Sequence, residues 1–324
     1  MLTLGDIKAT ILGHAIGDAL GVPVEFQTRE ELRDNPVVGM RGYGTYPVPA
    51  GAWSDDTSMT LALVESLARL GNVDYVDIMR NFIRWADEAE FTPTGVVFDM
   101  GHATMQALMK FAHGTAPLDC GGKSEYDNGN GSLMRIAPLA LWLYGKQEAP
   151  SCNAEAMEEL SKVSSLTHAH AISRMACGIY GCIVAGLLAG QNLGNAISSA
   201  LEKAHAFYGG IPEFCDSMPV YSRLWDMNSF ALIEESKLKS SGYVVDTLEA
   251  AIWCLLQTES YKECVLLAVN LGEDTDTVAA IAGGLAGLAY GANAIPEEWL
   301  NMLIRREYIE GLCEEFYRTV FKEE

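Results

Sequence analysis

Apolar residues recur every three to four positions along most of this chain, and this helical periodicity limits its possible folds more than any other feature. Helices are predicted over residues 6–20, 58–70, 75–88, 101–113, 155–163, 171–188, 195–206, 245–257, 261–270, 277–290 and 297–320. No stretch alternates apolar and polar residues between hairpin turns, and there is no βαβ spacing, GxGxxG motif or P-loop. The sequence therefore predicts an all-α fold.

The chain has 324 residues and no change of composition that would mark a domain boundary, so we expect one domain over residues 1–324. Asp and Glu outnumber Lys and Arg by 43 to 22, which gives a formal net charge of −21. A chain this acidic lacks the Lys and Arg clusters that bind the phosphate backbone of nucleic acids. For the same reason we expect no docking on anionic membrane surfaces.

The N-terminal segment and the cysteines favour a cytoplasmic protein. The first residues have neither a basic leader nor a small-residue cleavage site. The eight cysteines form no CxxC pair and several lie in apolar helical stretches, which favours buried free thiols in a reducing compartment. Residues 175–201 carry no charge over a length that could span a bilayer, but polar residues and helix-packing glycines favour a buried helix.

Two acidic clusters stand directly before apolar helices, one at residues 53–57 (WSDDT) and one at 272–277 (GEDTDT). Helix capping is the simpler interpretation of each cluster alone, because Ser and Asp side chains stabilise helix N-termini. If the clusters converged, their carboxylates would repel each other unless a cation neutralised them. A set of oxygen ligands without a Cys or His pattern favours Mg²⁺, Mn²⁺ or Ca²⁺. The sequence alone leaves open whether the clusters meet.

Three further acidic residues each have a plain structural interpretation. Asp18 stands in a run with glycines at positions 13, 17 and 21, the spacing of close helix packing, which favours a buried polar anchor. Glu25 begins a loop, where a surface side chain is the ordinary case. Asp99 precedes a predicted helix, where capping is the ordinary role.

The segment 128–132 (NGNGS) contains two Asn-Gly steps, which favour positive φ and exposed N–H groups. Such a loop could bind a phosphate or a ribose, and a turn without a ligand is an equally good interpretation. His168 and His170 are two residues apart and do not share a helix face, so they do not form a zinc pattern. There is no GxSxG motif and no cysteine in an electropositive setting, so carboxylates with metal ions remain the available catalytic chemistry.

Six motifs in order resemble the ADP-ribosylglycohydrolase family, with matching spacing from about residue 8 to residue 300. They are GDALG (17–21), WSDDT (53–57), FDMG (98–101), NGNGS (128–132), TH (167–168) and GEDTDT (272–277). The GDALG, FDMG and NGNGS motifs are most similar to those of the dinitrogenase-reductase-activating branch, which cleaves ADP-ribose from arginine. The resemblance implies a compact single-domain orthogonal bundle of helices with a binuclear metal site at helix N-termini.

The resemblance also implies roles for individual residues. Two Mg²⁺ or Mn²⁺ ions would be held by Ser54, Asp55, Asp56, Asp274, Asp276 and Thr277. Glu25 matches a glutamate on a mobile loop, and Asp99 matches an acidic residue near the scissile sugar. We expect Asp55 and Asp56 to position metal and water, and either Asp99 or Glu25 to handle the proton.

The same resemblance implies a substrate-binding wall. Its expected members, besides Asp99, are Asn128, Gly129, Asn130, Gly131, Ser132 and His168. Tyr126, just before this loop, could stack on adenine. Two positions depart from the family pattern, because Ser54 stands where Thr is frequent and Glu273 stands where Gly is common; neither change removes a ligand.

The expected function is a Mg²⁺- or Mn²⁺-dependent hydrolase that removes ADP-ribose from modified protein side chains, with the arginine linkage favoured. The expected partner is an ADP-ribosylated protein or a small molecule that contains ADP-ribose. Two alternatives stay open: a metallohydrolase acting on a serine, nucleobase or small-molecule linkage, and a non-catalytic crystallin-like or binding protein. Substrate choice is expected to reside in the loops 27–49 and 207–243.

Overall fold

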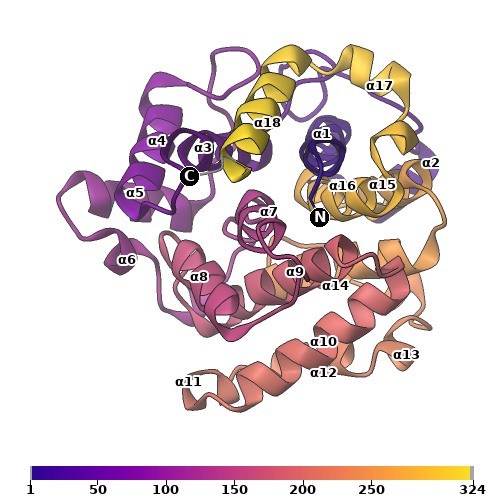
Figure 1. Cartoon of the computed structure of the whole chain (residues 1–324). Helices are drawn as coiled ribbons and strands as arrows, with labels where there is room; N and C mark the ends of the chain where they lie inside the picture. Colours follow the sequence, from indigo (N-terminus) through magenta and orange to yellow (C-terminus); the bar gives the residue numbers. More distant parts are fainter. Residues whose placement is uncertain (1, 322–324) are drawn as a thin grey trace.

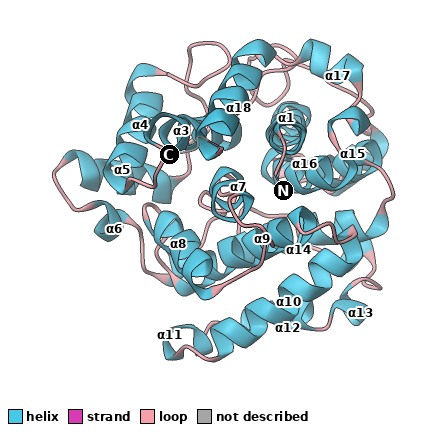
Figure 2. Ribbon diagram, viewed as in Figure 1, coloured by secondary structure: helices cyan, strands magenta, loops and turns pink. Residues whose placement is uncertain are grey.

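Helices joined by turns make up the fold of residues 2–321, which are the residues that the computed structural model describes (Figures 1 and 2). Within that range there is no strand, and β-pairing is limited to two isolated bridges, Gly122 with His168 and Gly129 with Tyr243. The predicted all-α class is therefore confirmed.

The longer helices carry most of the core. They are α1 (Leu4–Gly21), α3 (Asp55–Leu70), α4 (Tyr75–Glu88), α5 (His102–Ala112), α7 (Ala137–Gly145), α8 (Ala154–Ser165), α9 (Ala171–Leu188), α10 (Leu193–Gly209), α14 (Val244–Gln257), α15 (Tyr261–Val269), α16 (Thr275–Tyr290) and α18 (Arg306–Val320). Shorter helices connect them: α2 (Arg29–Asp34), α6 (Pro117–Cys120), α11 (Pro212–Cys215), α12 (Ser222–Trp225), α13 (Met227–Phe230) and α17 (Glu297–Met302). Single 3₁₀ turns complete the chain at Val22–Val24, Glu125–Asp127, Met218–Tyr221, Glu235–Lys237 and Ala292–Ala294.

The helices agree with the sequence periodicity at most positions, and two differences have a physical reason. Helix α7 was not predicted, because its nine residues are apolar on every side and show no stripe. The prediction of one helix over 297–320 is wrong, since the chain leaves the helix between α17 and α18. There the Ile304 N–H donates to the Gly51 carbonyl at 3.0 Å and Arg305 takes a left-handed conformation with φ 53°.

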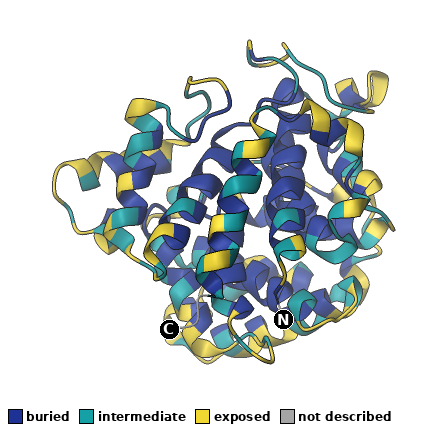
Figure 3. Cartoon of the chain, turned by 45° about the horizontal axis from the view of Figure 1, so that its top comes forward, coloured by how far each residue is buried: buried dark blue, intermediate teal, exposed yellow. Residues whose placement is uncertain are grey.

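The central pair of helices is α1 and α16, which lie against each other in the buried middle of the molecule (Figures 1 and 3). Their contact face is made of small residues, so the two backbones approach closely. A Cβ atom added to Gly17 would overlap the backbone of Ala279, and one added to Gly21 would overlap the backbone of Asp276. The glycine spacing therefore fixes where the start of α16 lies relative to the end of α1.

Helix α9 is long and apolar enough to cross a membrane by length and composition, but 78% of that window is buried inside the molecule. It packs against α7, α8, α10 and α14. Packing therefore accounts for its apolar character, as the glycines in its sequence predicted.

The prediction of free buried thiols needs correction at three cysteines. Cys152 and Cys182 form a disulfide, because the segment before α8 passes over α9 and brings the two Cα atoms to 5.0 Å, a distance that a disulfide spans. Cys215 is free but exposed. The thiols that are free and buried, as predicted, are Cys120, Cys177, Cys254, Cys264 and Cys313.

Candidate active site

A cleft of about 300 Å³ opens where the N-termini of α3 and α16 meet. It contains most of the residues that the sequence singled out. Its walls are formed by Glu25, Phe26, Asp55, Asp99, Gly101, His102, Ala103, Thr104, Tyr126, Gly129, Asn130, Gly131, Met134, His168, Gly242, Asp274 and Thr277.

Asp18 of α1 fixes the start of α3. Its carboxylate accepts hydrogen bonds from the Ser54 N–H at 2.9 Å, the Thr57 N–H at 3.0 Å and the Thr57 hydroxyl at 2.6 Å. The side chain is fully buried, so Asp18 is the polar anchor that the sequence suggested. Ser54 caps α3 by accepting from the Asp56 N–H, and its hydroxyl donates to Asp56 Oδ2 at 3.1 Å.

The start of α16 is held against the same end of α1. The Thr275 hydroxyl donates to the Gly21 carbonyl at 2.8 Å, which orients the first turn of α16. From that turn the Thr277 hydroxyl donates to Asp56 Oδ2 at 3.2 Å. The two acidic clusters, about two hundred residues apart in the sequence, therefore meet.

Glu25 and Asp99 complete the acidic cluster. One carboxylate oxygen from each lies within 4.8 Å of the others in the set Glu25, Asp99 and Asp276. The surface interpretation of Glu25 is wrong, since only 5% of it is exposed. The capping interpretation of Asp99 is also wrong: α5 begins at His102 without a side-chain cap, and Asp99 has a left-handed backbone with φ 52°.

Main-chain hydrogen bonds tie the Glu25 segment to the second acidic cluster. The Phe26 N–H donates to the Glu273 carbonyl at 2.7 Å, and the Glu273 N–H donates to the Gln27 carbonyl at 2.7 Å. Glu273 has φ 62°, a conformation that favours glycine. Its side chain is exposed, so the departure from the family pattern adds no buried charge to the cleft.

Burial raises the pKa of every carboxyl group in the cluster, and repulsion between carboxylates raises most of them further. The pKa of Glu25 rises to about 9, first through burial and then through Asp99 and Asp274. Burial and Asp274 raise the pKa of Asp99 to about 6. Burial is also the main cause that raises the pKa of the remaining carboxyl groups, which belong to Asp18, Asp55, Asp56, Asp274 and Asp276.

The donor atoms of this cluster fit a hard divalent cation. Several buried carboxylate oxygens have no hydrogen-bond partner among residues 2–321: Glu25 Oε2, Asp56 Oδ1, Asp274 Oδ1 and Asp276 Oδ2. Buried oxygens without donors are costly unless a cation or a proton satisfies them. Oxygen-only sets of this kind suit Mg²⁺, Mn²⁺ or Ca²⁺.

The segment 128–132 forms one wall of the cleft and is tied to the acidic cluster. Asn130 Nδ2 donates to Asp274 Oδ2 at 2.8 Å and to the Thr247 hydroxyl at 3.0 Å. Asn128 accepts from the Ser173 hydroxyl at 3.1 Å, and Ser132 is fully buried and accepts from the Ser164 hydroxyl. These contacts place the loop on α8, α9 and α14.

The expectation of positive φ in this segment is wrong, because neither Gly129 nor Gly131 has it. At Gly131 the reason for glycine is space. A Cβ atom there would lie 2.9 Å from His168 Cε1 and 3.1 Å from the Thr104 hydroxyl. Glycine therefore lets the loop pass close to His168 and the start of α5.

His168 contributes a neutral ring to the cleft. Burial and the nearby Arg135 charge lower the pKa of His168 to about 3. Its Nδ1 lies 2.7 Å from the Thr167 hydroxyl, which in turn accepts from Arg135 Nη2 at 2.8 Å. His170 does not share the cleft; it caps α9 and faces another hollow.

Two residues of this region were missed by the sequence analysis as functional candidates. Arg135 is fully buried and also donates to the Gly131 carbonyl, so it supports the cleft wall from behind. Tyr46 lies beside Glu25 and Asp99: burial, and after it the charges of Asp99 and Glu25, raise the pKa of Tyr46. Tyr46 lies in the loop 27–49, which was expected only to affect substrate choice, and Arg135 follows the segment 128–132 closely in the sequence.

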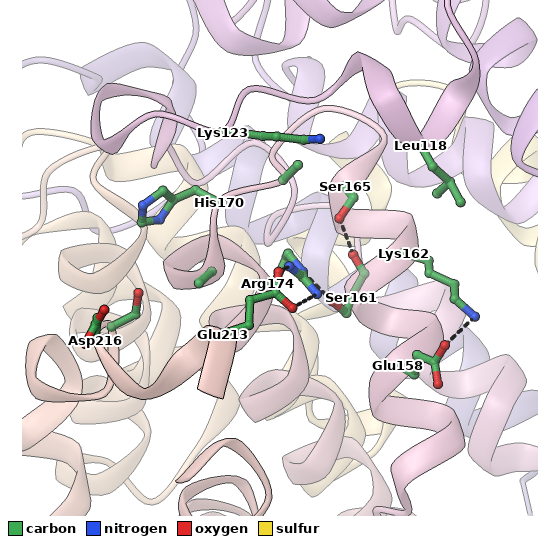
Figure 4. A pocket seen from close by; sticks show the side chains of 13 residues that line it. Leu118, Lys123, Glu158, Ser161, Lys162, Ser165, His170, Arg174, Glu213 and Asp216 are labelled. Atoms are coloured by element: carbon green, nitrogen blue, oxygen red, sulfur yellow. Dashed lines mark hydrogen bonds and ion pairs between the residues drawn. The ribbon is translucent and has the colours of Figure 1, made fainter. Parts of the chain in front are cut away.

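A larger hollow of about 610 Å³ lies on the other side of the 165–171 turn (Figure 4). Two of its basic side chains are already paired, Lys162 with Glu158 at 2.8 Å and Arg174 with Glu213. It contains none of the clustered carboxylates. Although this hollow is the larger of the two, only the smaller cleft contains clustered carboxylates, so we assign the candidate active site to the cleft.

Comparisons with known proteins find a matching family, similar sequences and a similar solved structure. The sequence matches the ADP-ribosylglycohydrolase family over residues 3–324. It is 32% identical over 317 residues to a Serratia proteamaculans protein named ADP-ribosylarginine hydrolase Tri1, covering 97% of this chain and 80% of that protein. It is also 32% identical to the ADP-ribosyl-(dinitrogen reductase) glycohydrolase of Rhodospirillum rubrum, over 90% of this chain and 88% of that one. The solved structure of an ADP-ribosylglycohydrolase-related protein complex aligns with a TM-score of 0.77 at 33% identity, over 98% and 99% of the two chains.

Proposed function

The chain belongs to the ADP-ribosylglycohydrolase family, and from this premise we propose that it is a Mg²⁺- or Mn²⁺-dependent hydrolase that releases ADP-ribose from modified arginine side chains. The observation that carries the proposal is the convergence of the two acidic clusters on one cleft, joined by Thr277 and Asp56. The arginine linkage is supported by two relatives at 32% identity, one named an ADP-ribosylarginine hydrolase and the other a dinitrogen reductase glycohydrolase.

Two ions are proposed to be held by the oxygens of the converging helix N-termini. The proposed ligands are Ser54, Asp55, Asp56, Asp274, Asp276 and Thr277. The unpartnered buried oxygens of Asp56, Asp274 and Asp276 support this assignment. Divalent ions bound there would supply orientation of the ribose hydroxyls and electrostatic activation of water.

Glu25 and Asp99 are proposed to hold and move the proton. Cleavage of the N-glycosidic bond develops positive charge at the anomeric carbon, which nearby carboxylates stabilise, and the leaving guanidine needs a proton. Both side chains line the cleft, and Glu25 Oε2 has no hydrogen-bond partner among the described residues. Tyr46, whose pKa both carboxylates raise, would position this pair.

The opposite wall is proposed to bind the ADP-ribose. Its members are Asn128, Gly129, Asn130, Gly131, Ser132 and His168, with Asp99 beside the scissile sugar. The tethering of Asn130 to Asp274 supports a wall held in register with the metal ligands. We further propose that residues 1–324 act as one domain, since the family match spans nearly all of them. A cytoplasmic location is proposed from the five buried free thiols, although the Cys152–Cys182 disulfide argues against a strictly reducing compartment.

The test is release of free ADP-ribose from a protein modified on arginine and, in parallel, from one modified on serine, each with Mg²⁺, Mn²⁺ or EDTA. We expect metal-dependent release from the arginine linkage. Release from serine alone would keep the family chemistry and overturn the linkage. No release from either substrate, with no binding of divalent ions, would favour a non-catalytic protein.

A further inference from the structure

The start of helix α5 forms part of the cleft wall, and the rest of the helix leads away from it. Gly101 to Thr104 line the cleft. At about 300 Å³, the cleft has room for a small ligand but not for a folded polypeptide. If the proposed function is correct, the protein that carries the modified arginine must therefore remain outside and rest on the rim.

One face of α5 is exposed and continuous with this rim. His102, Met105, Gln106, Met109 and His113 follow each other at helical spacing on that face. Met105 is 41% exposed and Met109 is 55% exposed. The opposite face of the helix is buried and packs against α4 and α6, so folding of the chain leaves the two methionines uncovered.

The charge of this face differs from that of the molecule as a whole. The chain carries a net charge of −21, yet no Asp or Glu occurs between Asp99 and Asp119. The exposed side of α5 is therefore apolar with histidine, and Lys110 lies at its margin. An approaching protein meets no fixed negative charge on this face, and flexible methionine side chains adapt to varied apolar partners.

Other apolar side chains surround the same opening. Phe26 is 66% exposed and Tyr126 is 98% exposed, and both line the cleft. Exposed apolar residues gathered at one site mark interaction surfaces more often than residues scattered singly. Exposed apolar side chains therefore lie both at the cleft and on the helix whose first residues line it.

We propose that the exposed face of α5, centred on Met105 and Met109, is the docking surface for the protein that carries the ADP-ribosylated residue. The partner contributes apolar side chains next to the modified position, and these pack on the two methionines while the ADP-ribosyl group enters the cleft. This inference rests on the proposed function and adds to it the way in which the macromolecular substrate is recognised.

The experiment compares one protein substrate with one small substrate. The double variant Met105→Glu/Met109→Glu is assayed on a folded protein ADP-ribosylated on arginine and on free ADP-ribosylarginine. We expect kcat/KM for the protein substrate to fall about tenfold or more, mainly through KM, because charges are placed in an apolar contact. We expect kcat/KM for free ADP-ribosylarginine to stay within about twofold, because neither methionine lines the cleft.

Two controls separate docking from general effects. Met105→Leu/Met109→Leu keeps the face apolar and is expected to retain the activity on both substrates. Met302→Glu introduces the same charge at a methionine that is 42% exposed, at the end of α17 and far from α5 (Figure 1). It is expected to leave both activities unchanged.

Two activity results would overturn the docking surface: unchanged activity of the double Glu variant on the protein substrate, or an equal loss of its activity on both substrates. A third is a change in the oligomeric mass of the double Glu variant, which would assign α5 to self-association. If the unaltered protein releases ADP-ribose from neither substrate, the proposed function fails first and this inference fails with it. If one of these three results is found while the unaltered protein still releases ADP-ribose, only the docking surface is overturned and the proposed function stands.

Discussion

At the scale of single residues, Asp276 connects the second acidic cluster, residues 272–277, with Glu25 and Asp99. Its backbone packs on Gly21, and one of its carboxylate oxygens lies within 4.8 Å of one oxygen each of Glu25 and Asp99. Burial and four neighbouring carboxylates raise the pKa of Asp276. The ionised carboxylate therefore destabilises the folded protein when no cation is bound and stabilises it when a cation is bound.

We expect Asp276→Ala to abolish hydrolysis and to weaken Mg²⁺ or Mn²⁺ binding while the fold is kept. In EDTA the variant should unfold at a temperature equal to or above that of the unaltered protein, because a repelling buried carboxylate is removed. Calorimetry with and without Mn²⁺ measures this. Asp119→Ala, an exposed acid outside the cleft, serves as the control. Turnover close to that of the unaltered protein in Asp276→Ala would refute the binuclear assignment.

Glu249 of α14 is a buried acid away from the cleft whose ionisation opposes folding. Only 3% of it is exposed, and burial raises its pKa to about 7 even though Arg223 lies 2.9 Å away and acts to lower it. In the unfolded chain the pKa is near 4.5. The folded state thus binds the proton of the Glu249 carboxyl group more tightly than the unfolded state does. This stabilises the fold below pH 4.5, and the stabilisation is lost as pH rises through 7.

The expected consequence is a pH-dependent difference between the unaltered protein and Glu249→Gln. The free energy of unfolding of the unaltered protein, relative to the variant, should decrease by about 2–3 kcal/mol between pH 4.5 and pH 7.5. Urea unfolding at a series of pH values measures it. An exposed glutamate, changed as Glu202→Gln, is expected to give a flat difference over the same range, and a flat curve for Glu249→Gln would contradict the assignment.

What the sequence reveals at this scale depends on whether a residue sits in a recognisable motif. The metal-ligand candidates stand in two dense clusters, so they could be singled out before the structure. Tyr46 and Glu25 stand alone in loop sequence, and only folding brings their side chains together beside Asp99. The resemblance supplied Glu25, whereas residue-by-residue reasoning placed it on the surface.

At the scale of elements, the α1–α16 pair sets the site geometry through its backbone contact. A Cβ atom on Gly17 would meet Ala279 C at 2.5 Å and Ala280 N at 2.9 Å. The two helices would have to separate to admit it, and the starts of α3 and α16 would move apart with them. The glycine spacing is therefore a condition for the acidic cluster as well as for the core.

We expect Gly17→Ala to lower the free energy of unfolding by about 3 kcal/mol, because overpacking displaces backbone rather than a flexible side chain. Metal affinity should decrease as well. The matched control is Gly311→Ala in α18, where nothing lies within 4 Å of the added Cβ atom. There alanine should stabilise the helix by about 0.5–1 kcal/mol. Equal effects of the two substitutions on urea unfolding would show that close packing is not the cause.

Helical elements were predictable where a polar face alternates with an apolar one. The predicted range of α4 is the observed one, and its buried residues recur along one side. The same reasoning fails for α7, which is apolar all round, and for the break before Arg305, which depends on a hydrogen bond to Gly51 far away in sequence. Periodicity reports one helix at a time and carries no information on such distant contacts.

At the scale of the whole molecule, the two ends of the chain share one core. Helix α1 packs on both α16 and α18, and α18 packs on α3. Buried apolar residues form a cluster that includes Leu2 near one end and Val320 near the other. Melting either end would therefore expose the supports of the acidic cluster, which couples the site to the stability of the fold.

This coupling predicts that urea unfolds the chain in one transition, with coincident curves from tryptophan fluorescence and far-ultraviolet circular dichroism. Mn²⁺ at about a hundred times its dissociation constant should move the midpoint to higher urea by the equivalent of about 2.7 kcal/mol, and EDTA should reverse the shift. Two separate transitions, with only one moved by the metal, would mean that the helices holding the cluster form a unit apart from α8 to α14. A single transition moved as a whole would instead mean that the core and the acidic cluster form together, because the helices that bury the core also carry the proposed metal ligands.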